Sequence, residues 1–144
     1  MPQTQTYKNH TRLLPPFHFF VLPVLLGNLL ITIRNIFRAP SLGTGWTAVV
    51  AAALLTFAIL ARNMALTAQN RIIRLEMRHR LKDVLPSDLQ SRIGELTPRQ
   101  LIALRFASDA ELPVLVREVL AGNLATQKAI KERVKNWQAD HLRV

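Results

Sequence analysis

The side chains that most often carry out chemistry in proteins are few and scattered in this chain. It has four histidines and no cysteine, so thiolate nucleophiles, thiolate metal sites and disulfides are excluded. No phosphate-binding glycine loop, dinucleotide fingerprint, HExxH or GxSxG motif occurs. All nine acidic residues lie at or after Glu76, among basic residues, which is typical of helix caps and ion pairs. We therefore expect a protein without enzymatic activity, bound metal or cofactor.

His18 is the one histidine whose surroundings raise a chemical question. It is the only ionisable side chain inside two long uncharged segments, residues 13–33 and 39–61. A neutral imidazole there could ligate a haem or another tetrapyrrole. The second segment holds no matching histidine, which counts against a ligand pair. His18 is therefore a weak candidate cofactor ligand, and the ordinary alternative is a hydrogen bond to a neighbour.

The two uncharged segments set the architecture of the first half of the chain. They contain 21 and 23 residues, in a protein that is 49% apolar despite a net charge of +10. About 20 helical residues cross the ~30 Å hydrocarbon core of a bilayer. We predict transmembrane helices at about 16–36 and 46–61, joined at the turn 43–45. A buried soluble hairpin fits less well, and so does a cleaved signal peptide, because no small-x-small cleavage site follows.

Several residues within the spans are suited to helix packing. Pro23 removes a backbone donor and is expected to kink the first span. Asn28 and Thr32, four residues apart, belong to one polar stripe, which in a membrane usually faces another helix. Ala48 and Ala52 form a small-xxx-small pair that permits close approach. These faces predict packing of the spans on each other, or docking of a partner subunit.

The second span is expected to continue as one long basic helix, residues 62–85. This segment contains no glycine or proline, and Pro86 follows it. Its basic side chains step by three and four residues and so share one face; they are Arg71, Arg74, Arg78 and Lys82. They could bind anionic lipid headgroups or an acidic protein. On an upright helix Lys82 would stand about 30 Å from the membrane, beyond the ~8 Å screening length at physiological salt. That favours a protein partner for the distal residues.

Residues 86–144 read as a small bundle of short helices. Thr97 and Gln100 form a capping box, and Ser108 with Glu111 predicts a second one. Gly122 is expected to end a helix and Thr126 to cap the last one. The expected core consists of Leu101, Leu104, Phe106, Leu112, Leu115, Val116, Val119, Leu120, Ile130, Val134 and Trp137. So small a core should depend on the long helix or on an oligomer for stability. The fold class is therefore all-α.

The stretch LTPRQLIALRF, residues 96–106, resembles the opening of helix-turn-helix domains in bacterial response regulators. That resemblance implies DNA binding. It covers about ten residues, and the expected turn glycine and recognition helix do not follow. A membrane-tethered nucleic-acid binder is therefore an alternative function, although we do not expect nucleic acid as a partner.

Four longer stretches resemble an uncharacterised family of short bacterial two-span membrane proteins of unknown function. They are YKNHTR, QNRIIRLEMRHRL, LIALRFASDAELPVLV and KNWQADHLRV. The resemblance implies a bacterial protein with a helical cytoplasmic tail. The excess of arginine and lysine after the second span also places both termini, including the tail 1–15, in the cytoplasm.

Together these features predict a multi-pass inner-membrane protein. The expected function is that of a non-enzymatic accessory or scaffold subunit, which docks a protein partner or a second copy through the basic helix. A subunit of an oligomeric transport or cofactor-carrying complex is a further alternative.

Overall fold

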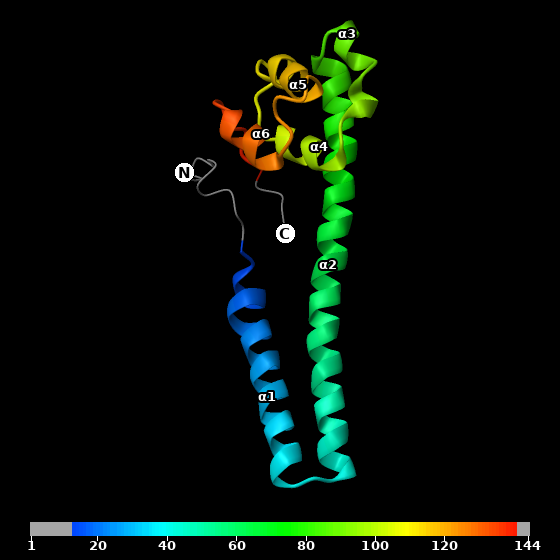
Figure 1. The fold of residues 1–144 in the computed structure, drawn as a ribbon. Helices are drawn as coiled ribbons and strands as arrows, with labels where there is room; N and C mark the ends of the chain where they lie inside the picture. Colours follow the sequence, from blue (N-terminus) through cyan, green and yellow to red (C-terminus); the bar gives the residue numbers. More distant parts are fainter. Residues whose placement is uncertain (1–12, 141–144) are drawn as a thin grey trace. The chain divides into compact units, whose positions relative to one another are not determined.

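The computed structural model describes residues 13–140, and every named element in this range is a helix. A π-helical turn, Pro16–Val21, leads into α1, Leu22–Arg38, and α2 follows as one helix, Leu42–Val84 (Figure 1). The remaining elements are short: α3 Ser87–Gln90, a 3-10 turn Ile93–Glu95, α4 Pro98–Leu104, α5 Leu112–Leu120 and α6 Gln127–Arg133. The all-α prediction and the uninterrupted continuation of the second apolar helix are confirmed. The described chain forms two compact units, residues 13–67 and 68–140, and α2 contributes to both. We call them the apolar unit and the C-terminal unit.

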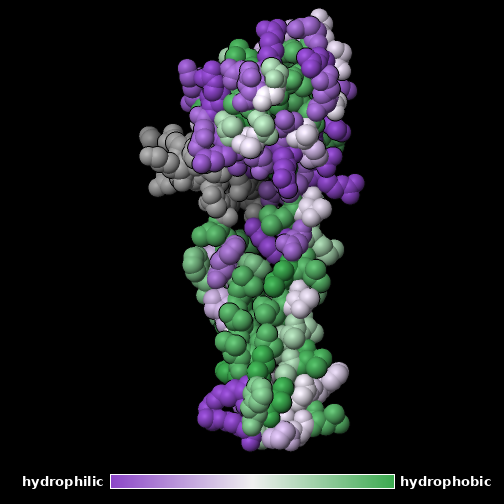
Figure 2. Space-filling view, viewed as in Figure 1, coloured by the Kyte–Doolittle hydropathy of each residue, from purple (hydrophilic) through white to green (hydrophobic). Residues whose placement is uncertain are grey.

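The apolar unit contains the two helices that are long and apolar enough to cross a membrane. They are Pro16–Arg38 and Leu42–Val84, the latter through its first part. Their large apolar side chains are mostly exposed; Phe37 is 83% exposed and Trp46 67%. Hydrophobic residues accordingly cover most of the visible surface of α1 and of the beginning of α2 (Figure 2). The core helices of a soluble protein would bury such side chains against the rest of the chain.

The chain reverses direction earlier than the sequence pattern predicted. α2 begins at Leu42, so residues 43–45 lie in its first turn rather than in the connection. The Ser41 hydroxyl accepts a hydrogen bond from the Thr44 backbone N–H at 3.1 Å, and the Thr44 hydroxyl accepts one from the Ser41 N–H at 3.0 Å. This reciprocal cap satisfies backbone donors that would otherwise be unpaired at the helix start. These hydrogen bonds stabilise the start of α2, where the two glycines of the first turn lower the intrinsic helix propensity.

The two helices of the apolar unit meet through small and polar residues, but not all of those predicted. Thr32 is buried on α1, and Ala48 and Ala51 are buried on α2. Ala52 is exposed, so the small pair at the contact is spaced by three residues rather than four. The predicted polar stripe is divided as well, because Asn28 is exposed. The Thr32 hydroxyl donates to the Leu29 carbonyl at 2.9 Å and so needs no partner on α2.

Pro23 stands where the helix changes its winding. The π-helical turn ends at Val21, and the Leu22 N–H donates to the Phe17 carbonyl, five residues back. Pro23 has no N–H to bond to Phe19, and its ring would press on that carbonyl in a regular α-helix. The wider turn just before it accommodates the proline. The expected kink stays a prediction.

The core of the C-terminal unit is built on the last turns of α2. Ile73, Met77 and Leu81, spaced by four residues, are buried together with side chains of α3 to α6. The predicted core residues are buried with two exceptions: Leu120 and Trp137 are half-buried at its edge. The α2 side chains belong to the same cluster as those of the short helices, so the unit shares its core with the long helix; the expected dependence of its stability on that helix stays a prediction.

The helix caps of the C-terminal unit follow the sequence at three of four sites. The Thr97 capping box is present, with hydrogen bonds of 2.7 and 3.3 Å to Gln100. Thr126 accepts from the Ala129 N–H at 3.1 Å and caps α6. Gly122 ends α5 at a φ of +82°, a conformation that favours glycine.

The fourth predicted cap, at Ser108, is wrong. The Ser108 hydroxyl donates to the Glu111 carboxylate at 3.1 Å instead of accepting a backbone N–H, and α5 begins only at Leu112. The Glu111 carboxylate is turned toward the end of the chain, where it accepts the backbone N–H groups of Lys135 and Asn136 at 3.1 Å. Lys135 and Asn136 follow the end of α6, so their N–H groups have no helical acceptor and are satisfied by this carboxylate.

Candidate functional site

The predicted basic side chains form one exposed stripe along the part of α2 that belongs to the C-terminal unit. This basic stripe consists of Arg71, Arg74, Arg78 and Lys82, all exposed except the half-buried Arg74. Among residues 13–140, none of the four forms an ion pair. The Nε atom of Arg74 is buried and has no hydrogen-bond partner within that range. The stripe is therefore open to charged groups from outside the described chain.

Other arginines of the same unit are used internally. Arg92 pairs with Glu95 at 2.8 Å, and Arg133 pairs with Glu118 at 2.9 Å. Each pair lowers the pKa of its acidic partner: the hydrogen bond from Arg133 lowers the pKa of Glu118, and the one from Arg92 lowers the pKa of Glu95. The basic stripe thus differs from these arginines in its pairing and not only in its charge.

A shallow hollow of about 310 Å³ lies within the basic stripe. It is lined by Arg71, Ile72, Arg74, Leu75 and Arg78. Ile72 is 57% exposed and Leu75 72%. Leaving such large apolar side chains in water is unfavourable compared with burying them. Their exposure is therefore notable on a helix whose opposite face is already buried. We call this feature the basic hollow.

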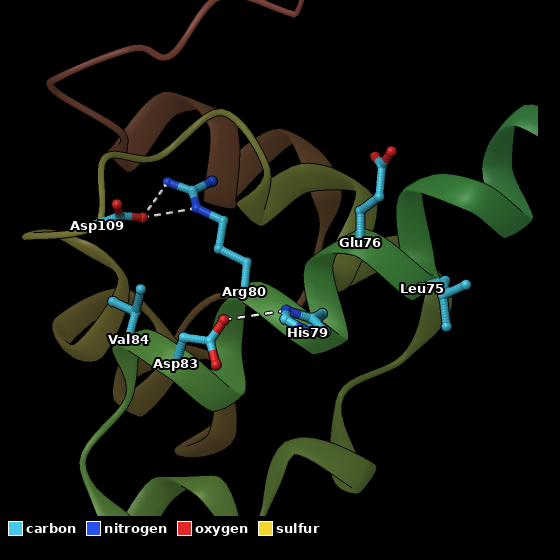
Figure 3. Close-up of a pocket in the computed structure, with 7 residues that line it drawn as sticks. All are labelled: Leu75, Glu76, His79, Arg80, Asp83, Val84 and Asp109. Carbon is cyan, nitrogen blue, oxygen red and sulfur yellow. Dashed lines mark hydrogen bonds and ion pairs between the residues drawn. The ribbon is translucent and has the colours of Figure 1, made fainter.

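A second hollow of about 600 Å³ lies on the other side of Leu75, and it carries acidic groups. Glu76, His79, Asp83 and Asp109 line it together with Leu75, Arg80 and Val84 (Figure 3). Arg80 reaches across to Asp109, and His79 Nδ1 lies 3.1 Å from the Asp83 carboxylate. Glu76 pairs with no side chain drawn in Figure 3. We call this the acidic hollow; from the sequence, Glu76 and Asp83 were expected only as parts of ion pairs along the helix.

The carboxylate of Glu111 has a structural role and lines neither hollow. It accepts hydrogen bonds from the backbone of Asn136 and Lys135 and from the Ser108 hydroxyl. Partial burial acts to raise the pKa of Glu111, but the Asn136, Lys135 and Ser108 hydrogen bonds outweigh it, and the pKa lies below its usual value. The ionised carboxylate therefore holds the segment after α6 against the start of α5.

His18 makes its hydrogen bonds within its own helical turn. Its Nδ1 atom lies 3.0 Å from the Leu14 carbonyl and 3.2 Å from the Leu14 nitrogen. Its ring meets Phe17 edge to face at 5.2 Å. Over residues 13–140, no three histidine or acidic side chains gather as a metal site. The hydrogen bond to a neighbour, which was the ordinary alternative for His18, is therefore present; ligation of a cofactor by His18 stays a hypothesis.

The stretch that resembled a helix-turn-helix opening begins α4 in the structure. Thr97 and Gln100 are explained by the capping box. The next helix, α5, buries Leu112 and Val116, while its Arg117 pairs with Asp88 at 3.3 Å. Charges on its outer side are therefore partly neutralised within the unit, and no observation here adds to the DNA-binding alternative.

Comparison with known proteins gives a family but no activity. A model for a protein family of unknown function, DUF6526, matches residues 1–144. The chain belongs to the DUF6526 family. No curated protein and no solved structure matches it. The predicted membership of an uncharacterised family is confirmed. Residues 1–12, with most of the predicted N-terminal tail, and residues 141–144 lie outside the described residues.

The DUF6526 protein thus carries one unusual surface, on the part of α2 within the C-terminal unit. An exposed apolar strip, Ile72 and Leu75, has positive groups on one side and negative groups on the other. Apolar contact supplies affinity in protein interfaces, and flanking charges supply orientation and specificity. The arrangement is suited to binding another protein surface.

Proposed function

We propose that this DUF6526 protein is a non-enzymatic accessory or scaffold subunit of the bacterial inner membrane. In this proposal α1 and the first part of α2 cross the bilayer as a hairpin, and the C-terminal unit lies in the cytoplasm. The basic stripe and its apolar neighbours dock a protein partner. The observation that carries the proposal is the basic stripe, which has no ion pair within residues 13–140 although the same unit pairs other arginines.

The exposed apolar unit supports insertion into a bilayer. At ~1.5 Å per residue, the 23 residues of Pro16–Arg38 extend about 35 Å, enough for the hydrocarbon core. Exposed side chains such as Phe19, Phe20 and Phe57, each at least 67% exposed, would be costly in water and favourable in lipid. Helical hydrogen bonds satisfy the backbone, as a membrane requires.

The distribution of basic residues supports the proposed orientation. Arg34 and Arg38 lie near the connection between the helices, whereas the segment after the second span carries a larger number. Basic residues near span ends favour the cytoplasmic side. This distribution supports a cytoplasmic position for the basic stripe and the C-terminal unit.

Insertion is tested first, by fractionation of cells that express the tagged full chain. The protein should remain with membranes after alkaline carbonate washing and require detergent for release. A chain that stays in the soluble fraction after lysis would overturn the proposal. Reporter fusions to the C-terminus test orientation: activity of a cytoplasmic reporter supports the proposal, and activity of a periplasmic one contradicts it.

Docking is tested by purification in mild detergent followed by mass spectrometry. We expect the full chain to elute as a complex, and the double reversal Arg71→Glu with Arg78→Glu to reduce complex formation. Arg99→Glu, an exposed charge reversal in the same unit, is the matched control and should leave the complex intact. A wild-type chain that elutes as a monomer with no bound protein would refute the docking role.

A further inference from the structure

The exposed side of α2 carries a second apolar pattern, opposite the face that is already buried. Ile73, Met77 and Leu81 face the core of the C-terminal unit. The other pattern steps by four, three, four and three residues, and its members are Ala68, Ile72, Leu75, His79 and Lys82. All five are exposed. A spacing that alternates between three and four is the a/d repeat of a coiled coil, and we call these five residues the seam.

The charges beside the seam follow the rule for a parallel two-stranded coiled coil. With Ile72 at an a position and Leu75 at d, Arg71 and Arg78 occupy g positions. Glu76 and Asp83 then occupy e positions, each five residues after one of these arginines. In parallel coiled coils, a g residue faces the e residue five positions later on the partner helix. Both possible g–e pairs in this stretch thus join opposite charges.

We infer that the partner docked on this surface is a second copy of the chain, whose α2 pairs in parallel with the first over residues 68–83. In this dimer Arg71 of each copy faces Glu76 of the other, and Arg78 faces Asp83. Ile72 and Leu75 of both copies pack in the centre. The inference rests on the proposed function, because insertion of both copies into one membrane with the same topology makes their helices parallel.

The two hollows fit this arrangement. Leu75 lines both the basic hollow and the acidic hollow, so the charges of opposite sign lie on opposite sides of one exposed leucine. A two-fold axis along the helix pair brings the basic hollow of one copy against the acidic hollow of the other, twice per dimer. Arg71, Arg78 and Glu76 have no ion pair among residues 13–140 and are available to do this.

The seam is short, and the membrane compensates for that. His79 and Lys82 are polar at seam positions, which lowers the stability of a coiled coil while helping to fix its register. Confinement of two anchored chains to one bilayer raises their effective concentration. A weak helical contact suffices under those conditions. An unrelated acidic partner would use the arginines but would have no use for Glu76 and Asp83, and this difference makes the two occupants separable.

Disulfide crosslinking tests the seam directly, because the natural chain contains no cysteine. Leu75→Cys places a thiol at a d position, and Asn70→Cys places one on the opposite side of the same helix, also exposed. In oxidised native membranes, Leu75→Cys should form a covalent dimer at least about fivefold more than Asn70→Cys. Equal crosslinking, or none for Leu75→Cys, would overturn the inference. Failure with the chain still in the membrane fraction leaves the proposed function standing.

Charge reversal then identifies the occupant. Arg78→Glu and Asp83→Arg each create like-charge g–e pairs, and each alone should lower Leu75→Cys crosslinking about fivefold. Coexpressed with different tags, the two variants should pair with each other. In the mixed dimer the introduced glutamate of one copy faces the introduced arginine of the other, and the second g–e pair keeps its natural Arg78 and Asp83. Recovery of mixed dimers supports the second copy and shows that both variants fold. Loss with Arg78→Glu alone, no effect of Asp83→Arg and no recovery would instead indicate an acidic partner and refute the dimer.

Discussion

The Arg80 side chain donates a hydrogen bond to the Asp109 carboxylate at 2.7 Å, across 29 positions of sequence. The same guanidinium donates to the backbone carbonyls of Arg105 at 3.2 Å and Ala107 at 2.8 Å. Arg80 thus joins α2 to the segment between α4 and α5. Its side chain is 22% exposed, against 59% for Asp109. Two of these three hydrogen bonds therefore go to carbonyl groups, from a side chain in a half-buried position.

The first prediction concerns the difference in burial and hydrogen bonding between Arg80 and Asp109. Arg80→Ala should destabilise the C-terminal unit by about 1–3 kcal/mol, because it removes charge-assisted hydrogen bonds to two carbonyls as well as to Asp109. Asp109→Ala should cost less than about 1 kcal/mol, since it removes only an exposed ion pair. Hydrogen exchange of the amides around residues 105–112, in the detergent-solubilised full chain, measures both effects. Equal costs would mean that the ion pair, not the carbonyl contacts, holds this segment.

The second prediction is a dependence of stability on pH through Glu111. Its pKa in the folded chain lies below the usual value, so folding favours the ionised form. The resulting stabilisation is fully present above the unfolded pKa, about 4.3, and is lost as the pH falls through the folded pKa. Amide exchange at Lys135 and Asn136 should therefore be faster in Glu111→Gln than in the natural chain at pH 6. The two proteins should converge toward pH 3; a constant difference over this range would contradict the assignment.

The sequence predicted helices well and their exact contacts less well, for physical reasons visible at single residues. Uncharged length and the Thr97 capping box are local signals, and the two long apolar helices and the cap are both present. Ser108 offers the same local signal, but its hydroxyl donates to the Glu111 carboxylate, which also accepts the backbone N–H groups of residues 135 and 136, far along the chain. A capping pattern cannot show such a competitor. Similarly, the choice between Ala51 and Ala52 at the helix contact depends on the rotation of two helices about their axes, which composition does not fix.

Only the basic side of the candidate surface was predicted from the sequence. The basic stripe was evident from the spacing of its arginines. The acidic side was missed because Glu76 and Asp83 are ordinary residues on the side of a helix, and their significance depends on knowing which face is buried. Once Ile73 and Met77 are seen to be covered, the exposure of Ile72 and Leu75 requires an explanation. The signal was present as the five-residue spacing between arginine and acid.

The third prediction separates folding of the C-terminal unit from association. Leu81→Ala removes a fully buried side chain of α2 and should destabilise the unit by about 2–5 kcal/mol. Leu75→Ala, six residues earlier on the same helix and 72% exposed, should change stability by less than about 0.5 kcal/mol. Amide exchange across residues 98–120 reports folding, and the size of the detergent-solubilised complex reports association. We expect Leu75→Ala to affect only the second; a loss of protection in residues 98–120 would place Leu75 in the core instead.

The fourth prediction tests the contact between α1 and α2 in the apolar unit. Ala51 is 1% exposed, whereas its neighbour Ala52 is exposed. Ala51→Leu adds three carbon atoms where the two helices meet, and overpacking of this kind costs about 1–3 kcal/mol. Ala52→Leu adds the same atoms to an open face and should cost less than about 0.5 kcal/mol. Thermal unfolding of the apolar unit, followed by helical circular dichroism of the full chain in detergent, compares the two. Equal effects would show that Ala52 also lies at a helix contact, as the small-xxx-small pattern predicted. A larger effect of Ala52→Leu would mean that Ala52, and not Ala51, faces α1.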